Sequence, residues 1–194
     1  ARDASVPLDT IERAVKRGTG ELEGVQYEQA SYEGYAPGGV AVLVEVLTDN
    51  RNRTSAEIRS IFTRNGGSLA EPGAVAWQFE RKGVLVVPRS ADEDEVMTVG
   101  LEHGLEDLVA EGDTWQLTCE ATATTGLRQA LTDEGVGVES FDVTMVPTAT
   151  IPLASADEAR AVLRVVDELD DHDDVQGVHA NFDIPDDLLQ TVAG

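Results

Sequence analysis

Arginine and asparagine side chains alternate at one point of the sequence, and both types suit the binding of an anion. Residues 49–54 read Asp-Asn-Arg-Asn-Arg-Thr, where a β-branched run gives way to a helical pattern. The free N–H groups and dipole of a helix start attract an anion, and a guanidinium group binds phosphate through two parallel hydrogen bonds. The candidate contacts are Arg51, Asn52, Arg53, Arg59 and Arg64. In the alternative, the first two arginines form ion pairs with Asp49 and Glu57.

A second group of cations lies nearer the start of the chain. Residues 6–17 predict a short helix with apolar Leu8, Ile11 and Val15 on one face, followed by a Gly-Thr-Gly loop. The cations at the end of this helix are Arg13, Lys16 and Arg17. They suit phosphate contacts, although cations at a helix C-terminus also complement the helix dipole. The two groups together favour nucleic-acid binding over ion pairing alone.

Signatures of catalysis are absent from the sequence. It contains no phosphate-binding, nucleophile-elbow or zinc-ligand pattern. Residues 170–174 (Asp-Asp-His-Asp-Asp) offer carboxylates to a divalent cation, but consecutive residues of a loop diverge, which favours a solvated turn over a metal site. His103 and His179 have no partner at catalytic spacing and are expected to be exposed or hydrogen-bonded. We therefore expect a protein that is not an enzyme, with no catalytic residue, cofactor, metal or small-molecule substrate.

The single cysteine and the hydrophobicity profile indicate the cellular compartment of the protein. Cys119 lies in an alternating stretch and lacks a disulfide partner in the chain, which favours a buried thiol in a reducing compartment. No run of about 18 apolar residues occurs, and the first residues lack a signal-peptide pattern. We expect a cytoplasmic protein that does not bind membranes.

Charge is distributed unevenly along the chain. The formal net charge is −23, yet residues 1–89 hold 11 Lys and Arg against 12 Asp and Glu, whereas residues 90–194 hold 3 against 25. An anionic partner is therefore expected to bind the first half. The abundance of acidic residues, with only two lysines, leads to the hypothesis of a halophilic source, because salt screens the self-repulsion of an acidic chain.

Hydrophobic periodicity and turn residues predict an alternation of strands and helices. In the first half we expect a strand at 29–35, a turn at 36–39, a strand at 40–47, a helix opened by a capping box at 54–57 and stopped at 65–67, and a hairpin of strands 74–79 and 84–87. In the second half we expect a helix from 92 to about 110, a strand at 114–121, a helix at 126–134, a strand at 138–146, a helix from a capping box at 155–158, and a strand at 175–182. Trp77 and Phe79 are expected to face the core.

The turn at 36–39 is a candidate partner loop, because a rigid proline is followed by two flexible glycines. The residues concerned are Tyr35, Pro37, Gly38 and Gly39. A plain hairpin turn explains the proline and glycines equally well.

Several longer motifs carry a specific resemblance. Tyr-Glu-Gly-Tyr-Ala-Pro-Gly-Gly-Val-Ala at 32–41, Leu-Thr-Asp-Asn-Arg-Asn-Arg-Thr at 47–54 and Phe-Glu-Arg-Lys-Gly at 79–83 resemble the YebC family. Residues 9–21 and 181–185 match as well, so the resemblance spans essentially the whole chain. The mitochondrial relatives in this family are translational activators of cytochrome oxidase.

The resemblance implies an α+β fold of two ferredoxin-like modules, one inserted into the other, plus the remnant of a helical N-terminal domain. We expect residues 1–26 to be that remnant, residues 27–89 and 148–194 to form domain II, and residues 90–147 to form an inserted acidic domain III. The family usually begins with a further basic helical segment, which this sequence lacks. Strand 175–182 is then expected to rejoin the sheet begun by strand 40–47.

The resemblance further implies regulation of gene expression by nucleic-acid binding, described for the family as DNA-binding transcriptional regulation. A competing description makes members ribosome-associated translation factors that contact ribosomal or transfer RNA and relieve stalling at proline-rich stretches. The charge asymmetry supports a third hypothesis, an adaptor whose acidic module docks on a basic protein. The arginine-bearing helix is a weak base reader, because Ile58, Ile61 and Phe62 are needed for packing.

Overall fold

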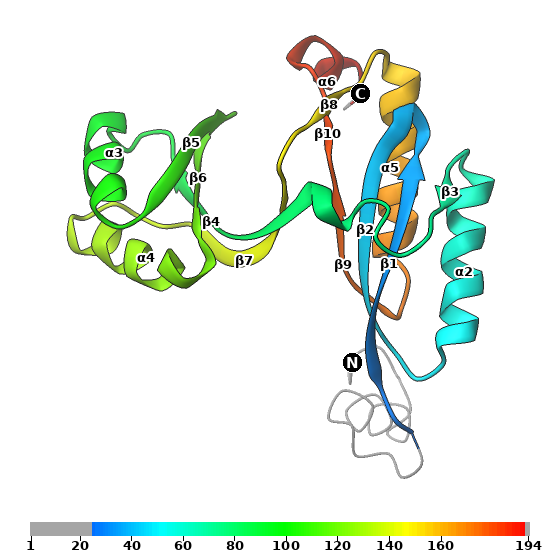
Figure 1. Ribbon diagram of the computed structural model, residues 1–194. Helices are drawn as coiled ribbons and strands as arrows, with labels where there is room; N and C mark the ends of the chain where they lie inside the picture. Colours follow the sequence, from blue (N-terminus) through cyan, green and yellow to red (C-terminus); the bar gives the residue numbers. More distant parts are fainter. Residues whose placement is uncertain (1–24, 193–194) are drawn as a thin grey trace, which may run out of the picture. The chain divides into compact units, whose positions relative to one another are not determined.

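The computed structural model describes residues 25–192, which form two compact units (Figure 1). Unit 1 runs to Ala76 and resumes at Thr150, and unit 2 comprises Trp77–Ala149. Unit 2 is therefore inserted between two sequence-distant halves of unit 1. The expected helix at 6–17, the N-terminal domain remnant and the cations Arg13, Lys16 and Arg17 lie outside the described residues.

Unit 1 is built on a four-stranded sheet of order β3-β1-β2-β9. Its strands are β1 (Glu28–Ala36), β2 (Val40–Thr48), β3 (Ser68–Leu69) and β9 (Val175–Ala180). β1 and β2 form an antiparallel hairpin through the 3-10 turn η2 (Pro37–Gly39), in which Gly38 has a φ of 78° that favours glycine. β9 pairs with β2 antiparallel, so the expected return of the chain to this sheet is confirmed.

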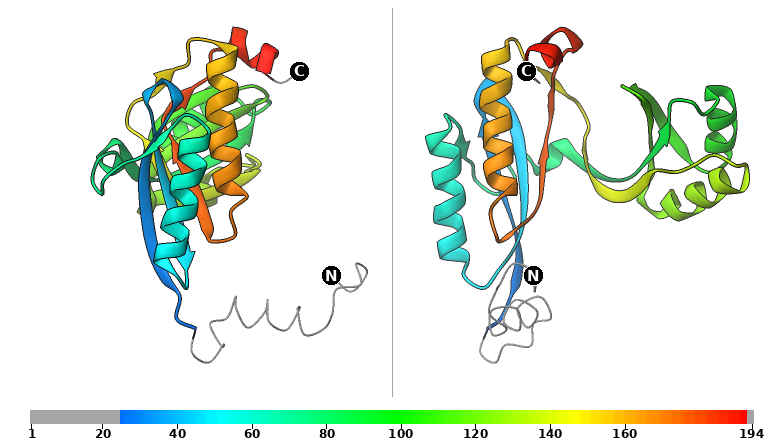
Figure 2. Two further views of the ribbon diagram at one scale, coloured as in Figure 1. Left: turned by 90° about the vertical axis from the view of Figure 1, so that its right-hand side faces the viewer. Right: turned by 180° about the vertical axis from the view of Figure 1, so that it is seen from behind.

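Two helices, α2 (Arg51–Arg64) and α5 (Ala156–Asp170), cover one face of this sheet (Figure 2). The alternate residues Val40, Val42, Val44 and Val46 of β2 point toward them and are buried. The capping box that opens α5 is confirmed, because the Ser155 hydroxyl accepts a hydrogen bond from the Glu158 N–H at 3.2 Å. The remaining elements are β8 (Ile151–Pro152), β10 (Phe182–Asp183), which pairs parallel with β8, and the helix α6 (Asp186–Val192).

Unit 2 repeats the arrangement with a sheet of order β5-β6-β4-β7, antiparallel throughout. Its elements are η3 (Ala76–Gln78, beginning on the last residue of unit 1), β4 (Phe79–Pro88), α3 (Glu93–Glu102), β5 (Leu105–Glu111), β6 (Thr114–Glu120), η4 (Ala121–Ala123), α4 (Thr124–Asp133) and β7 (Ser140–Pro147). Leu85 and Leu117 of the sheet pack with Val96 of α3 and Leu127 of α4 in a separate core. Each unit thus pairs a four-stranded antiparallel sheet with two helices, and the α+β fold of two modules is confirmed.

The predicted hairpin at 74–87 is wrong. Residues 79–88 form the single strand β4, and Gly83 lies inside it rather than in a turn. A Cβ on Gly83 would lie 1.9 Å from the Thr124 hydroxyl and 2.8 Å from the Cys119 sulfur, so this glycine serves close packing of α4 on the sheet. Because β4 pairs with β6 and β7, the structure places 79–88 in unit 2, earlier than the expected boundary at residue 90.

Two other sequence expectations fail in unit 2. The helix expected to reach residue 110 ends at Glu102, because Gly104 adopts a φ of 86°, and strand β5 follows. Trp77 is 73% exposed instead of facing the core, whereas Phe79 is buried as expected. Cys119 is a buried free thiol, as predicted, and burial raises its pKa.

Candidate nucleic-acid interface

The arginine-bearing helix α2 begins earlier than its predicted capping box. The side chain of Asn50 accepts a hydrogen bond from the Arg53 N–H at 3.1 Å, so Asn50 caps the helix and Arg51 is its first residue. Thr54 does not cap, because its hydroxyl is buried between Thr48 Oγ1 at 2.7 Å and Asp174 Oδ2 at 2.7 Å. The capping-box prediction is therefore wrong, and Arg51 and Arg53 belong to the first helical turn.

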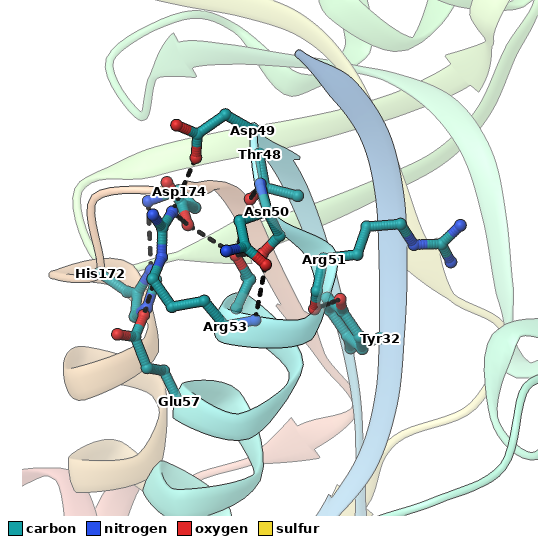
Figure 3. A network of polar contacts seen from close by, with 10 residues as sticks. Tyr32, Thr48, Asp49, Asn50, Arg51, Arg53, Glu57, His172 and Asp174 are labelled. Atoms are coloured by element: carbon teal, nitrogen blue, oxygen red, sulfur yellow. Dashed lines mark hydrogen bonds and ion pairs between the residues drawn. The ribbon is translucent and has the colours of Figure 1, made fainter. Parts of the chain in front are cut away.

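Arg53 is held in a network of carboxylates (Figure 3). Its Nη2 lies 2.8 Å from Asp174 Oδ2 and 3.0 Å from Asp49 Oδ1, and its Nε lies 3.9 Å from Glu57 Oε2. Burial opposes the charge of Asp174, but hydrogen bonds from Thr54 and Arg53 outweigh burial and lower the pKa of this carboxyl. The ion-pair alternative thus describes Arg53, which joins α2 to the turn before β9.

Histidine and acidic groups from the predicted loop at 170–174 meet α2 in the same network. His172 Nδ1 accepts the Asp174 N–H at 3.1 Å, so its Nε2 carries the proton and donates to Glu57 Oε2 at 2.8 Å. Ligand atoms of Glu57, His172 and Asp174 lie within 4.8 Å of one another, as a metal site would require. The guanidinium of Arg53 already supplies positive charge to the carboxylates of this cluster. His172 and Asp174 therefore have the geometry of a hydrogen-bonded turn that faces α2.

The other arginines of α2 differ in how firmly they are paired. Arg64 Nε donates to Glu168 Oε2 of α5 at 2.8 Å, and this contact lowers the pKa of Glu168. Arg51 Nη1 lies 3.8 Å from Glu28 Oε2, and both side chains are more than half exposed. An exposed pair at this distance is weak, so Arg51 is available to a ligand.

Arg59 makes no ion pair with any residue between 25 and 192. It lies on the outer face of α2, opposite the buried face that contains Ile58 and Phe62. An open hollow on this outer face is lined by Asn52, Ser55, Ala56, Arg59, Ser60, Thr63 and Arg64. Residues at spacings of three and four share a helix face, so Arg59 lies among short side chains, and the second arginine of the hollow, Arg64, is paired with Glu168. This α2 outer face (Asn52, Ser55, Arg59, Ser60 and Thr63) is the candidate interface.

Sequence reasoning missed the short polar members of this surface. Ser55, Ser60 and Thr63 give little signal alone, but their spacing with Arg59 marks the face that Ile58, Ile61 and Phe62 leave free. The packing face and the polar face of α2 are distinct. Packing therefore does not prevent the helix from contacting a ligand.

The predicted partner loop lies at one end of unit 1. Tyr35 is 36% exposed, and a Cβ on Gly38 would lie 2.6 Å from Glu158 Oε1 near the start of α5. Gly66, just after α2, approaches the ring of Pro37, with its Cβ position 3.7 Å from Pro37 Cγ. Packing near both helices accounts for Pro37 and Gly38, whereas Gly39 is favoured by its φ of 75°.

The charge of unit 1 makes α2 exceptional. Residues 25–76 and 150–192 hold 6 arginines and no lysine against 17 Asp and Glu. Four of these arginines lie in α2, together with one glutamate, Glu57. The helix is therefore the cationic element of an acidic unit.

The chain resembles known proteins over almost its whole length. Residues 27–182 match the family model described as the second and third domain of TACO1/YebC. A probable transcriptional regulatory protein of Dictyoglomus turgidum is 47% identical over 195 residues, covering 100% of this chain and 78% of the relative. One of the same name from Rubrobacter xylanophilus is 50% identical over 196 residues, with the same coverage. The crystal structure of a conserved hypothetical protein from Aquifex aeolicus superposes with a TM-score of 0.75 at 41% identity, covering 96% of this chain and 77% of that one.

The described residues also bear on membrane association. None of the helices between residues 25 and 192 is both long and apolar enough to span a bilayer.

Proposed function

The chain belongs to the TACO1/YebC family, and from this premise we propose that it regulates gene expression, without catalysis, by binding nucleic acid through the α2 outer face. The names of the relatives as probable transcriptional regulatory proteins support the regulatory role and make duplex DNA the first ligand to test. The observation that carries the proposal is Arg59, an arginine without an ion pair in the described residues, surrounded by short polar side chains on the cationic helix of an acidic unit.

The composition of this face favours phosphate contact over base reading. Asn52, Ser55, Ser60 and Thr63 are short, so a phosphate backbone can approach the helix while Arg59 neutralises one phosphate. Arg51 lies outside this face, beside Glu28 of β1, and its long and exposed pair leaves it open to a separate phosphate. Arg53 and Arg64 are committed to Asp174 and Glu168 and contribute less. We expect binding that is sensitive to salt and weakly selective for sequence.

A salt series with matched variants tests this interface. Arg59→Ala should weaken binding of the chain to a labelled DNA duplex and reduce the slope of log K against log salt by about 1, as expected for one lost phosphate contact. Arg164→Ala removes an exposed arginine of α5 and should leave both quantities unchanged. Arg53→Ala is a poor probe, because it also breaks the contact with Asp174.

The outcomes separate this proposal from its competitors. Equal effects of Arg59→Ala and Arg164→Ala would exclude the α2 outer face. Sedimentation of the same proteins with ribosomes tests the other anionic partner: ribosome association lost in Arg59→Ala, with no measurable DNA binding, would replace DNA by ribosomal or transfer RNA as the ligand of this face.

A further inference from the structure

Strand β7 is an edge of the unit 2 sheet with little protection against the addition of another strand. It pairs with β4 along Ser140–Pro147 without a register shift, and no strand among residues 25–192 pairs with its other side. Proteins usually protect an edge with charges, bulges or short length. The eight residues of β7 include one charged residue, Asp142, a proline only at the last position, Pro147, and no register shift within the strand.

The opposite edge of the same sheet carries the protection that β7 lacks. The register of β5 shifts between Leu105 and Asp107. Glu106, Asp107 and Glu111 are exposed along this strand. A bulge and three carboxylates disfavour pairing, so the two edges of one sheet differ in what they can accept.

Backbone groups of β7 point away from the sheet at alternate residues. The Thr148 N–H donates to the Gln78 carbonyl at 2.9 Å, so the backbone N–H and C=O groups of even-numbered residues point toward β4. The outward N–H of Val143 instead donates to the carboxylate of its neighbour Asp142 at 2.8 Å. The outward groups of Phe141, Val143 and Met145 form a row that an extended segment can pair with, once the Val143 N–H exchanges the Asp142 carboxylate for an incoming carbonyl.

Side chains along β7 define the chemistry of such a segment. Phe141 lies opposite Leu85, a core residue, so the side chains of the odd-numbered residues of β7 share the face of the sheet that the helices cover. Phe141 is 45% exposed there, and the guanidinium of Arg128 lies 4.2 Å from its ring centre. Asp142 lies on the other face, as does Glu80, the partner of Val146. Residues 77–149 hold 4 Lys and Arg against 15 Asp and Glu. On β7 itself an added strand would thus meet Phe141, Val143 and Met145 on one face and Asp142 on the other; Arg81 and Lys82 of β4 lie one strand further in, opposite Met145 and Thr144.

We propose that β7 binds, by strand addition, a partner-protein segment in which apolar and basic residues alternate. Main-chain hydrogen bonds to the outward row supply affinity, and the alternation supplies specificity. The apolar side chains pack beside Phe141 and Val143, and the basic ones approach Asp142. A second copy of this chain is a poorer occupant, because its unit 2 carries the same net negative charge. This surface is separate from α2 and goes beyond the proposed function.

A synthetic peptide of alternating valine and lysine tests the proposal with the full chain. The peptide should bind and protect the amides of Phe141, Val143 and Met145 from hydrogen exchange, measured by NMR. Val143→Pro removes an outward donor and should weaken binding roughly tenfold, as expected for one or two lost hydrogen bonds. Leu108→Pro is the matched control, because the Leu108 N–H also donates to its preceding aspartate, Asp107, at 3.0 Å on the other edge. It should leave binding unchanged.

Several outcomes would overturn strand addition at β7. A shuffled peptide of the same composition that binds equally well would indicate diffuse charge attraction. Equal losses in the two proline variants, or protection confined to other strands, would place the peptide elsewhere. Dimerisation that protects the β7 amides without peptide would make a second copy the occupant. If Val143→Pro impairs folding, the hydrogen-exchange measurement on the unmodified chain with the peptide still decides whether the β7 amides are protected.

Discussion

At the scale of single residues, Glu33 is the clearest case of a charge that is used inside the protein. Its side chain is buried, and its carboxylate accepts hydrogen bonds of 2.7 Å from the N–H groups of Gly73, Val75 and Ala76. Burial opposes ionisation, but the three backbone bonds outweigh it and lower the pKa of Glu33. This carboxylate fixes the loop that leads from β3 toward the end of the first segment of unit 1.

We predict that Glu33→Gln lowers the free energy of unfolding by about 2–3 kcal/mol at neutral pH, because an amide cannot accept from all three donors. The folded-state pKa lies below the unfolded value, so this stabilisation is present above about pH 4.3 and is lost as pH falls through the folded pKa. The variant should therefore lose part of the wild-type acid sensitivity. Urea unfolding followed by circular dichroism across pH 2–7 measures both effects.

Glu71→Gln is the control, because Glu71 is exposed on the same loop. It should change the free energy of unfolding by less than about 0.5 kcal/mol. If Glu33→Gln unfolds at the same urea concentration as this control, the three hydrogen bonds contribute nothing net.

Arginines show what the sequence can and cannot predict about a site. The pattern at 49–54 predicted cations at the start of a helix, and the structure places Arg51 and Arg53 there. It could not tell a bound cation from an available one, because Asp174, the partner of Arg53, lies 121 residues away in the sequence. Only the fold brings this carboxylate to α2, while leaving Arg59 without an ion pair among the described residues.

At the scale of secondary-structure elements, one lysine joins three strands of unit 2. Lys82 Nζ on β4 lies 2.9 Å from Glu106 Oε2 on β5, 2.7 Å from Glu120 Oε1 on β6, and 3.7 Å from Glu80 Oε2. Hydrogen bonds from Lys82 lower the pKa of Glu120, and the carboxylates raise the pKa of Lys82. Without this cation, the carboxylates would repel one another across neighbouring strands.

Lys82→Met should therefore lower the melting temperature of unit 2, and by more at low salt than at high salt, where repulsion is screened. It should also raise the pKa of Glu120, measured by NMR titration. Arg81→Met is the matched control, because it removes the neighbouring exposed cation, which makes no ion pair within the described part of the chain. An unchanged melting temperature in Lys82→Met would mean that the cluster does not stabilise the sheet.

Elements with strong local signals were predictable, and those set by tertiary contacts were not. The strands β1, β2 and β6 and the cap of α5 followed from alternation and from Ser155, because these signals are local. The hairpin at 74–87 failed because a glycine in a strand and a glycine in a turn look alike in sequence. What distinguishes Gly83 is the approach of Thr124, some forty residues later in the chain.

At the scale of the whole molecule, insertion of unit 2 into unit 1 followed from the family resemblance and the acidic shift near residue 90. The exact crossing point did not follow, because β4 carries Arg81 and Lys82 and so resembles in charge the near-neutral stretch 1–89, yet it pairs within the second sheet. Composition reports where the acidic surface begins. Strand pairing decides where a folding unit begins.

The same acidic surface predicts how stability depends on salt. Residues 25–76 and 150–192 carry a net charge of −11, and so do residues 77–149, so each unit repels itself. We expect the melting temperature to rise with potassium chloride concentration and the fold to be lost below about 0.5 M salt, because weaker screening leaves the self-repulsion of the acidic units uncompensated. Calorimetry over a salt series measures this dependence, and full stability in dilute buffer would refute the halophilic hypothesis.

A pair of substitutions separates general screening from specific ion binding. Glu102 ends α3 and Glu134 follows the last residue of α4, and both are exposed where a negative charge opposes the helix dipole. Glu102→Gln with Glu134→Gln should therefore raise the melting temperature most at the lowest salt concentration at which the chain still folds, and change it little in high salt. An equal gain at every salt concentration would mean that the gain is not electrostatic, because salt screens both the helix dipole and the general repulsion, and no gain would point to ions bound at particular sites. Only a gain that fades as salt rises matches a molecule whose stability is limited by its total charge.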